Sequence, residues 1–475
     1  MATELHAGQV VDGFRLEERT HRGGMASLWR VVHVDGIEDL PLIMKVPRIR
    51  GGDDPAAIVG FEVERMILPT LSGPHVPRFV ARGDFTGQPY IVMERIGGDT
   101  LRARLDDAPL PIAELAAIGA QVALALHDLH RQHVVHLDVK PSNILFRDSG
   151  EAVLIDFGLS RHDRLPDLLE EEFRLPMGTA PYMSPEQVQF VRNDPRSDLF
   201  ALGVMLYHLA TGARPFGQTS SVRGLRQRLY RAPTPPRALR PECPPWLQEI
   251  VLRCLEANPD SRHQSAAQLA FDLQHPDQVV LTARSRRLSA PGRWRTLKRW
   301  LSAMGAEPQL PDATEQTTRS PIVLAAVDVS SATAPLLEAL QAAVQRMMQM
   351  APGARLACLA VMRTNRIGMD ELLDADGSSR HVNLLVQLKH WARPVVQALK
   401  IAHDEQDARV TFHVIEGPDA ADAIVDYARR NQVDHIVMGA RSSSTLRRYL
   451  GSVSAQVVAQ ADCTVTVVRA ADATR

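Results

Sequence analysis

The chain has 475 residues, of which 45% are hydrophobic and 23% are charged, a balance that is ordinary for globular proteins. At about 100–200 residues per domain, this length predicts roughly three compact units. The formal net charge of -1 excludes a global electrostatic field that would draw the chain to nucleic acid or to a membrane. The four cysteines form no C-x-x-C pair, which argues against a disulfide framework and a zinc site and favours the reducing cytoplasm.

Neither a secretory signal nor a membrane span is predicted. The N-terminus carries Glu4 and Asp12 and lacks an apolar core. The most apolar stretch, Pro111 to Leu126, contains polar residues and is shorter than the about 18 apolar residues that a span needs. We therefore expect a cytoplasmic protein without a transmembrane segment.

The first part of the chain predicts a β-rich unit, with strands at Phe14–Leu16, Ser27–His33 and Pro41–Val46. Lys45 lies inside an apolar strand pattern, and because an unpaired buried ammonium group is costly, its position implies an anionic partner. A helix expected from Phe61 to Leu71 offers Glu62 and Glu64, which lie on different faces of that helix.

A second, longer helix is expected from Pro111 to His133, where apolar residues recur at helical spacing. Histidines follow one another at intervals of three residues, at His127, His130, His133 and His136. Each such step drifts about 60° around a helix, so the four imidazoles cannot share one metal ion. We interpret them as ordinary core and helix-end histidines.

The stretch His136-Leu-Asp138-Val-Lys140-Pro-Ser-Asn143 is followed by Asp156-Phe157-Gly158. Phosphoryl transfer to an alcohol needs a carboxylate beside the hydroxyl, a cation on the phosphate and oxygen ligands for magnesium, and these residues supply all three. No Walker sequence occurs in the chain. The ordered motifs resemble the catalytic core of a bacterial, eukaryotic-like serine/threonine protein kinase. Thr179, expected near Lys140, is typical of the serine/threonine class.

The resemblance extends from Phe14 to Leu273 and implies an α+β two-lobed protein kinase fold, with an N-lobe at about 14–96 and a C-lobe at about 97–273. It implies that Asp138 orients and deprotonates the substrate hydroxyl and that Lys140 stabilises the transferring phosphoryl group. Asn143 and Asp156 are implied to hold Mg²⁺, for which Mn²⁺ is an alternative. Lys45 is implied to position the ATP phosphates, paired with Glu64 in preference to Glu62.

Further ATP contacts are implied at the glycine-rich loop by Gly23, Gly24 and Met25, and at the hinge by Met93, Glu94 and Ile96. Met93 is equally well interpreted as a plain core methionine. Matched to G-x-G-x-x-G-x-V, the loop keeps one glycine of the pattern, so a surface hairpin turn is the alternative. This depletion supports a rival function, a pseudokinase scaffold that binds nucleotide and signals without phosphoryl transfer.

Leu137 stands where most kinases carry an arginine that pairs with a phosphate on the activation loop. From Arg161 to Gly178 the chain has no Ser, Thr or Tyr. The two absences agree, and they predict that phosphorylation in the middle of this loop does not control the enzyme. The acidic run Glu170 to Glu172 is interpreted as a solvated loop face in preference to a phosphate mimic. The resemblance also implies that Asp198 holds the catalytic-loop backbone and that Arg262 pairs with Glu186.

Residues 274–320 predict a basic amphipathic segment and a linker. Arginines and lysines from Arg284 to Arg299 alternate with Trp294, Leu297 and Trp300, so this segment either lies on anionic lipid or an acidic partner or packs on a flanking domain, which we favour. From Glu307 to Ser320 the chain is polar and proline-containing, as in a flexible linker, and its hydroxyl residues are candidate autophosphorylation sites.

From Ile322 onwards strands and helices alternate, which predicts an α/β domain with a doubly wound parallel sheet. The strands are expected at Ile322–Val327, Arg355–Val361, Val410–Ile415, His435–Met438 and Thr464–Val468. The helices are expected at Ala334–Met350, within His381–His403, at Asp419–Asn431 and at Ser452–Gln460. A ligand would bind where the strands end, beside Asp328 and the loop from Gly439 to Gly451 and Ser452.

Residues 321–469 resemble a universal stress protein domain. Members that bind nucleotide carry G-x2-G-x9-G-[ST], whereas here Ser442 replaces the second glycine and eight residues separate it from Gly451. Either a second nucleotide binds at Asp328, Gly439, Gly451 and Ser452, or the domain is a sensor or dimerisation module with a vestigial loop. The resemblance implies a stress-sensing role and a homodimer through this domain.

Overall fold

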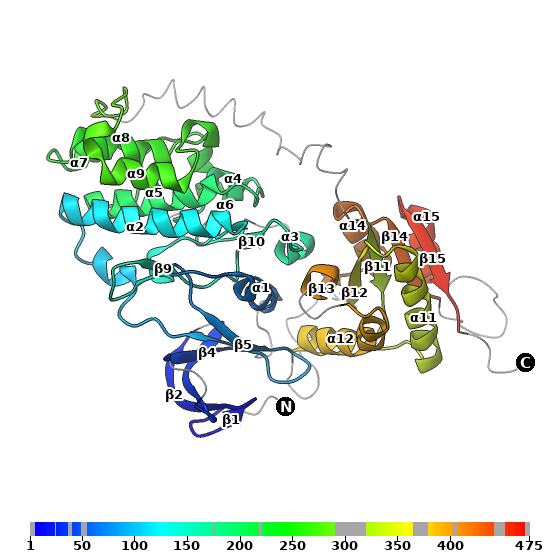
Figure 1. Cartoon of the computed structure of the whole chain (residues 1–475). Helices are drawn as coiled ribbons and strands as arrows, with labels where there is room; N and C mark the ends of the chain where they lie inside the picture. The colour runs from blue at the N-terminus through cyan, green and yellow to red at the C-terminus, as the bar shows by residue number, and fades with distance from the viewer. Residues whose placement is uncertain are drawn as a thin grey trace, which may run out of the picture.

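The computed structural model describes residues 5–23, 25–36, 40–48, 55–173, 176–217, 221–289, 320–363, 379–401, 406–440 and 452–470. Two lobes built from the first part of the chain stand beside a separate α/β domain (Figure 1). In this view the first helix of the chain and a short helix near residue 170 face that domain.

The N-lobe is an antiparallel sheet with strand order β1-β2-β3-β4-β6-β5. Its strands are β1 (Val10–Val11), β2 (Phe14–Arg22), β3 (Ala26–His33), β4 (Leu42–Pro47), β5 (Phe79–Gly83) and β6 (Tyr90–Glu94), and it carries the helix α1 (Pro55–Ile67). Alternation along β4 sends Leu42, Met44 and Val46 into the core on one face of the sheet. Ile43 and Lys45 therefore point to the opposite face, which α1 covers.

The C-lobe is built around the buried helices α2 (Ile112–Arg131), α5 (Arg196–Thr211), α8 (Pro245–Cys254) and α9 (Ala266–Gln274). Shorter helices are α3 (Leu168–Glu172), α4 (Pro185–Val188), α6 (Val222–Leu225) and α7 (Pro236–Leu239). Two small antiparallel sheets pair β7 (Val134–Val135) with β10 (Arg161–His162) and β8 (Ile144–Phe146) with β9 (Ala152–Leu154). Short 3-10 helices lie at Leu68–Thr70, Leu101–Leu105, Pro141–Asn143, Arg226–Leu229, Pro259–Ser261 and Pro276–Gln278. The motifs His136–Asn143 and Asp156–Gly158 lie in the loops that connect these four strands.

Among the described residues, α2 is the one helix whose length and composition would suffice to cross a membrane. The helix was expected from Pro111 to His133, close to its observed bounds, but the expectation that its apolar part is too short for a span is wrong. Leu115, Val122, Leu126 and Leu129 of α2 are buried against the rest of the C-lobe. The apolarity of α2 is therefore explained by its place in a protein core.

The C-terminal domain has a five-stranded parallel sheet of order β13-β12-β11-β14-β15. Its elements are β11 (Ile322–Ala326), α11 (Ala334–Met350), β12 (Arg355–Arg363), α12 (Arg380–Ala398), α13 (Gln406–Arg409), β13 (Val410–Gly417), α14 (Ala420–Arg430), β14 (His435–Gly439), α15 (Ser452–Gln460) and β15 (Thr464–Val468). Val323 and Ala325 pack with α11 and α12, whereas Ile322 and Leu324 pack with α14 and α15. Both faces of the sheet are thus covered, as expected for a parallel sheet.

The α+β two-lobed fold and the doubly wound α/β domain predicted from the sequence are confirmed. Element bounds differ most in the N-lobe, where α1 begins at Pro55 instead of Phe61 and β2 extends to Arg22 instead of Leu16. The described part of the basic connector packs on the C-lobe, because Arg284 forms ion pairs with Glu249 at 3.2 Å and with Glu256 at 2.9 Å. The expected amphipathic helix with Trp294 and Trp300, and the linker from Glu307, lie outside the described residues apart from Ser320.

Candidate active site

Asp138, Lys140 and Thr179 form one hydrogen-bonded cluster in the cleft. Lys140 Nζ lies 2.6 Å from Asp138 Oδ2 and 3.0 Å from Thr179 Oγ1, and the Thr179 hydroxyl donates to Asp138 Oδ1 at 2.7 Å. The backbone N–H of Thr179 donates to the same oxygen at 3.0 Å. Asn143 Nδ2 donates to Asp138 Oδ2 at 3.2 Å, which fixes the carboxylate from the other side. The cluster places a carboxylate beside a hydroxyl group and an ammonium group.

The catalytic-loop backbone is held by Asp198 in the first turn of α5. Its carboxylate accepts from the backbone N–H of His136 at 2.9 Å and of Leu137 at 2.8 Å. His130 Nε2 lies 2.9 Å from the same carboxylate. Leu137 has a φ of 61°, a left-handed conformation that is strained for a leucine and needs such fixation. The role expected for Asp198 therefore agrees with its contacts.

Lys45 meets its expected partner Glu64 and also contacts Asp156, which the sequence did not lead us to pair with it. Its Nζ lies 2.5 Å from Glu64 Oε2 and 2.8 Å from Asp156 Oδ1. Burial opposes the charge on Lys45, but Asp156 and Glu64 outweigh it and raise the lysine pKa. The same ammonium group holds the pKa of Asp156 at about 2. The chosen partner Glu64 faces the cleft, whereas Glu62 points elsewhere.

Asn143 and Asp156 come together because of the β8–β9 hairpin. Ile144 pairs with Leu154, and the N–H of Ile155 donates to the carbonyl of Asn143 at 3.0 Å. Asn143 and Asp156 therefore lie at the same end of one hairpin. A carboxylate and a carboxamide supply the oxygen ligands that Mg²⁺ prefers, and the Asp156 side chain is 43% exposed to the cleft. The donor set thus fits a magnesium ion.

The glycine-rich segment is a hairpin turn between β2 and β3. The Gly23 N–H donates to the carbonyl of Ala26 at 3.0 Å, and Arg48 donates to the Gly23 carbonyl. The Met25 side chain is 68% exposed, and Gly24 lies outside the described residues. The segment therefore forms a hairpin turn, and its contact with ATP stays a prediction.

At the hinge, Met93 is buried at the end of β6, so it is a core residue whatever else it contacts. Glu94 receives a hydrogen bond from Arg147 Nη2 at 2.9 Å and is tied by it to the C-lobe. Ile96 follows β6 and is half-buried. These contacts join the lobes along the segment expected to face adenine.

Asp167 is a residue that the motif reasoning missed. Its carboxylate lies 2.8 Å from Arg192 Nε and 3.8 Å from Arg161 Nε, and it caps α3 by accepting from the Glu170 N–H at 3.2 Å. The Asp167 carboxylate therefore links Arg161, in the activation segment, to Arg192, which follows α4. The sequence carried a signal for it, since Asp167 followed three residues later by Glu170 is a helix-start pattern.

Two further contacts hold α4 against the rest of the C-lobe. Gln187 of α4, which the motifs did not indicate, donates from its side chain to the carbonyl of Leu137 at 2.7 Å. Arg262 Nη1 lies 2.6 Å from Glu186 Oε1, and the arginine side chain has no exposed surface. The expected pair between Glu186 and Arg262 is thus present.

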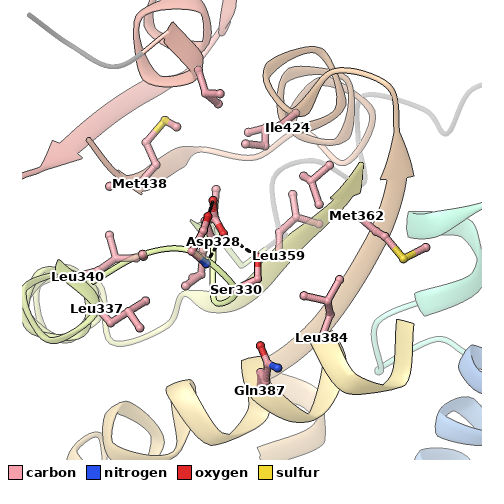
Figure 2. A pocket seen from close by; sticks show the side chains of 18 of the residues that line it. Asp328, Ser330, Leu337, Leu340, Leu359, Met362, Leu384, Gln387, Ile424 and Met438 are labelled. Carbon is pink, nitrogen blue, oxygen red and sulfur yellow. Dashed lines mark hydrogen bonds between the residues drawn. The ribbon is translucent and has the colours of Figure 1, made fainter. Parts of the chain in front are cut away.

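The C-terminal domain has a cavity of about 560 Å³ where β11 and β14 end. Asp328 and Gly439 line it, together with leucines from α11 and α12 (Figure 2). Asp328 is engaged locally, because its carboxylate accepts from the Ser330 hydroxyl at 3.0 Å and from the Ser331 hydroxyl at 2.8 Å. Ser442 and Gly451 lie outside the described residues, as does the side chain of Ser452.

Comparison with known proteins agrees with both folds. Residues 54–275 match the protein kinase domain, and residues 321–469 match the universal stress protein family. Serine/threonine-protein kinase PknL of Mycobacterium bovis is 32% identical over 271 residues, which are 57% of this chain and 67% of the relative. Serine/threonine-protein kinase PknB of Mycolicibacterium smegmatis is 33% identical over 309 residues, covering 61% of this chain and 48% of the relative.

PknB of Mycobacterium leprae is similar as well, at 31% identity over 278 residues. The fold and these relatives define a protein kinase. The chain belongs to the family of bacterial serine/threonine protein kinases and carries a universal stress protein domain after the kinase lobes. The family match begins after Lys45, so the first strands are assigned to the kinase by the sheet that they share with β6.

Proposed function

We propose that this chain transfers the γ-phosphoryl group of ATP to serine or threonine hydroxyls of proteins, with a magnesium ion as cofactor. The single observation that carries the proposal is the cluster of Asp138, Lys140 and Thr179. Asp138 accepts the proton of the substrate hydroxyl, and Lys140 stabilises the charge on the phosphoryl group as it moves. The hydroxyl of a substrate serine or threonine would lie beside Asp138, next to the Thr179 hydroxyl.

The ion pair between Lys45 and Glu64 supports a site in which Lys45 holds the ATP phosphates. Mg²⁺, or Mn²⁺ in its place, neutralises phosphate charge when it is bound, and Asn143 and Asp156 are the residues that would hold it. Asp156 contacts Lys45 at 2.8 Å, so the lysine would exchange this contact for phosphate oxygens when nucleotide binds. Gly23, Met25, Met93, Glu94 and Ile96 would border the nucleotide.

The test is incorporation of labelled phosphate from ATP into the chain itself and into a generic protein acceptor. We expect Asp138→Asn and Asp156→Ala to lose at least about a hundredfold in rate, as typical of a lost general base or metal ligand. Asp148→Asn, an exposed aspartate in the β8–β9 turn, is the matched control and should keep wild-type activity. Incorporation that survives in both site variants would refute the proposal.

The rival is a scaffold that binds nucleotide without transferring phosphate, and the depleted glycine segment supports it. In that case ATP would raise the unfolding temperature of the wild-type chain while no acceptor gained phosphate. For the C-terminal domain we propose a small ligand in the cavity beside Asp328 and Gly439, for which nucleotide is the first candidate. Equilibrium dialysis with ATP, comparing wild type with Asp328→Ala, measures that binding separately from the kinase site.

A further inference from the structure

The outer face of α1 is held by the C-terminal domain. Glu64 on α1 points to Lys45, and Glu62 on a different face accepts two hydrogen bonds from Lys389 of α12, each at 3.1 Å. Lys389 is 7% exposed, and its ammonium group lies 5.6 Å from the ring of Phe85 and 5.7 Å from that of Phe412. A buried ion pair of this kind joins a helix of the N-lobe to a helix of the other domain.

A second set of contacts holds the activation segment. Glu171 of α3 lies 2.8 Å from Arg355 Nη1 and accepts from the Tyr427 hydroxyl at 3.0 Å. His413 Nε2 lies 3.1 Å from the Glu171 carboxylate, and His413 Nδ1 lies 3.0 Å from that of Glu172. The solvated-face interpretation of this acidic run is therefore wrong for Glu171 and Glu172, whose side chains are 12% and 3% exposed.

The charges at this contact are complementary and nearly free of solvent. Burial opposes the ionised form of Glu171, but Arg355 and His413 outweigh it and hold the glutamate pKa at about 2. Burial likewise opposes the charged form of His413, and its hydrogen bonds to Glu171 and Glu172 outweigh burial and raise the histidine pKa to about 9. Burial raises the pKa of Glu172. The contact therefore favours a cation at His413 and an anion at Glu171.

Apolar side chains close the space between the two polar contacts. Met362, Val382, Leu385 and Val414 of the C-terminal domain belong to the same buried cluster as the kinase residues Val59, Phe85, Leu168 and Leu169. Figure 1 shows α1 and α3 lying side by side, facing β13 and α12. The two domains are thus joined by a continuous core.

We propose that the C-terminal domain docks in cis on α1 and α3 and thereby holds the kinase lobes in the catalytically assembled arrangement. This inference rests on the proposed kinase function. The reason for the proposal is that both contacts are present in the same structure. Lys389 of the C-terminal domain holds Glu62 of α1, and on the same helix Glu64 pairs with the catalytic Lys45. Docking would replace the phosphate that other kinases place on the activation segment, where this chain has Leu137 and no central hydroxyl residues. Lys389, Arg355 and His413 act here as positioning residues.

The experiment uses the full chain and two readouts, which are hydrogen exchange of α1 and α3 and incorporation of labelled phosphate. We expect Lys389→Glu and Arg355→Glu each to speed exchange in these helices and to lower the rate of phosphate transfer by roughly 5- to 150-fold, the usual range of coupling between sites. The matched control is Arg429→Glu, whose ion pair with Asp462 is 58% and 70% exposed, and it should change neither readout.

Charge exchange separates docking from misfolding. Because Arg65 also pairs with Glu62 at 3.0 Å, the exchange needs three changes: Glu62→Lys, Arg65→Glu and Lys389→Glu together reverse the charges of the cluster. We expect this triple variant to recover both slow exchange and phosphate transfer. Unchanged exchange in the single variants would overturn the docking. Faster exchange with unchanged or increased phosphate transfer would overturn the activating role.

Two further outcomes are distinguishable. Protection of α1 and α3 that disappears on dilution would show that a second copy supplies the C-terminal domain, and it would overturn docking in cis. If the wild-type chain transfers no phosphate to any acceptor, the proposed kinase function fails, whereas the exchange measurements still decide whether the domains dock.

Discussion

Replacing Asp167 with alanine should loosen the activation segment by a predictable amount. The change removes the cap of α3, which is typically worth about 1 kcal/mol, and the carboxylate that pairs with Arg192 at 2.8 Å. A hydrogen bond to a charged group contributes about 1.5–3 kcal/mol, and the Asp167 side chain is 8% exposed, so solvent screens the pair little. The sum predicts that α3 opens more easily by about 2.5–4 kcal/mol.

Hydrogen exchange of the amides from Glu170 to Phe173 measures this opening free energy locally, which avoids a global unfolding transition in a two-domain chain. Asp167→Asn keeps an oxygen that can cap the helix and loses the charge, so its effect should be smaller by about 1 kcal/mol. Equal effects of the two variants would show that the cap contributes nothing. Unchanged exchange in Asp167→Ala would refute the assignment of Asp167 as the carboxylate that orders this segment.

Other expectations follow from buried charges. Glu186→Gln leaves the buried guanidinium of Arg262 without its anion and should lower the opening free energy of α4 and α5, measured by hydrogen exchange, by about 3–5 kcal/mol, whereas the exposed Glu242→Gln should change it little. Leu137→Arg places a charge where the leucine is 3% exposed, so we expect the folded state to lose roughly 2 kcal/mol or more of stability. The rate of phosphate transfer should not rise, and a rise would contradict control without a phosphate on the activation segment. Protonated His413 stabilises the docked arrangement, and this stabilisation is fully present below the ordinary histidine pKa of 6.5. It is lost as pH rises through the raised pKa of about 9. Limited proteolysis, which does not depend on hydrogen exchange, should therefore detect undocking near pH 9. An unchanged proteolysis pattern up to about pH 10 would exclude that histidine as a determinant of docking.

The sequence predicted those parts of the site that short-range patterns determine. Asp138, Lys140 and Asn143 lie within six residues, so their proximity follows from one loop, and the β8–β9 hairpin brings Asp156 to the same place. The alternation of strands and helices was enough for the C-terminal fold, because each buried strand is a near-continuous apolar run.

Other features depend on tertiary contacts that local patterns do not encode. Spacing favoured Glu64 over Glu62 only weakly, since the rotation of α1 decides which carboxylate meets Lys45. Glu62 pairs with Arg65 on its own helix and with Lys389, 327 residues further along the chain. The acidic run resembled a solvated surface because its cations come from another domain. The sequence shows that Glu171 and Glu172 are charged, but only the packing of the two domains shows that they are removed from solvent.

Helix α12 contacts the cavity of the C-terminal domain on one face and the kinase lobes on another. Arg380, Asn383, Leu384 and Gln387 form one stripe that lines the cavity of the C-terminal domain, and Val382, Leu385 and Lys389 form another that meets the kinase lobes. A molecule that fills the cavity would press on the same backbone that carries Lys389. The cavity of the C-terminal domain and the contact with α1 are therefore separated by the width of one helix, about 10–12 Å.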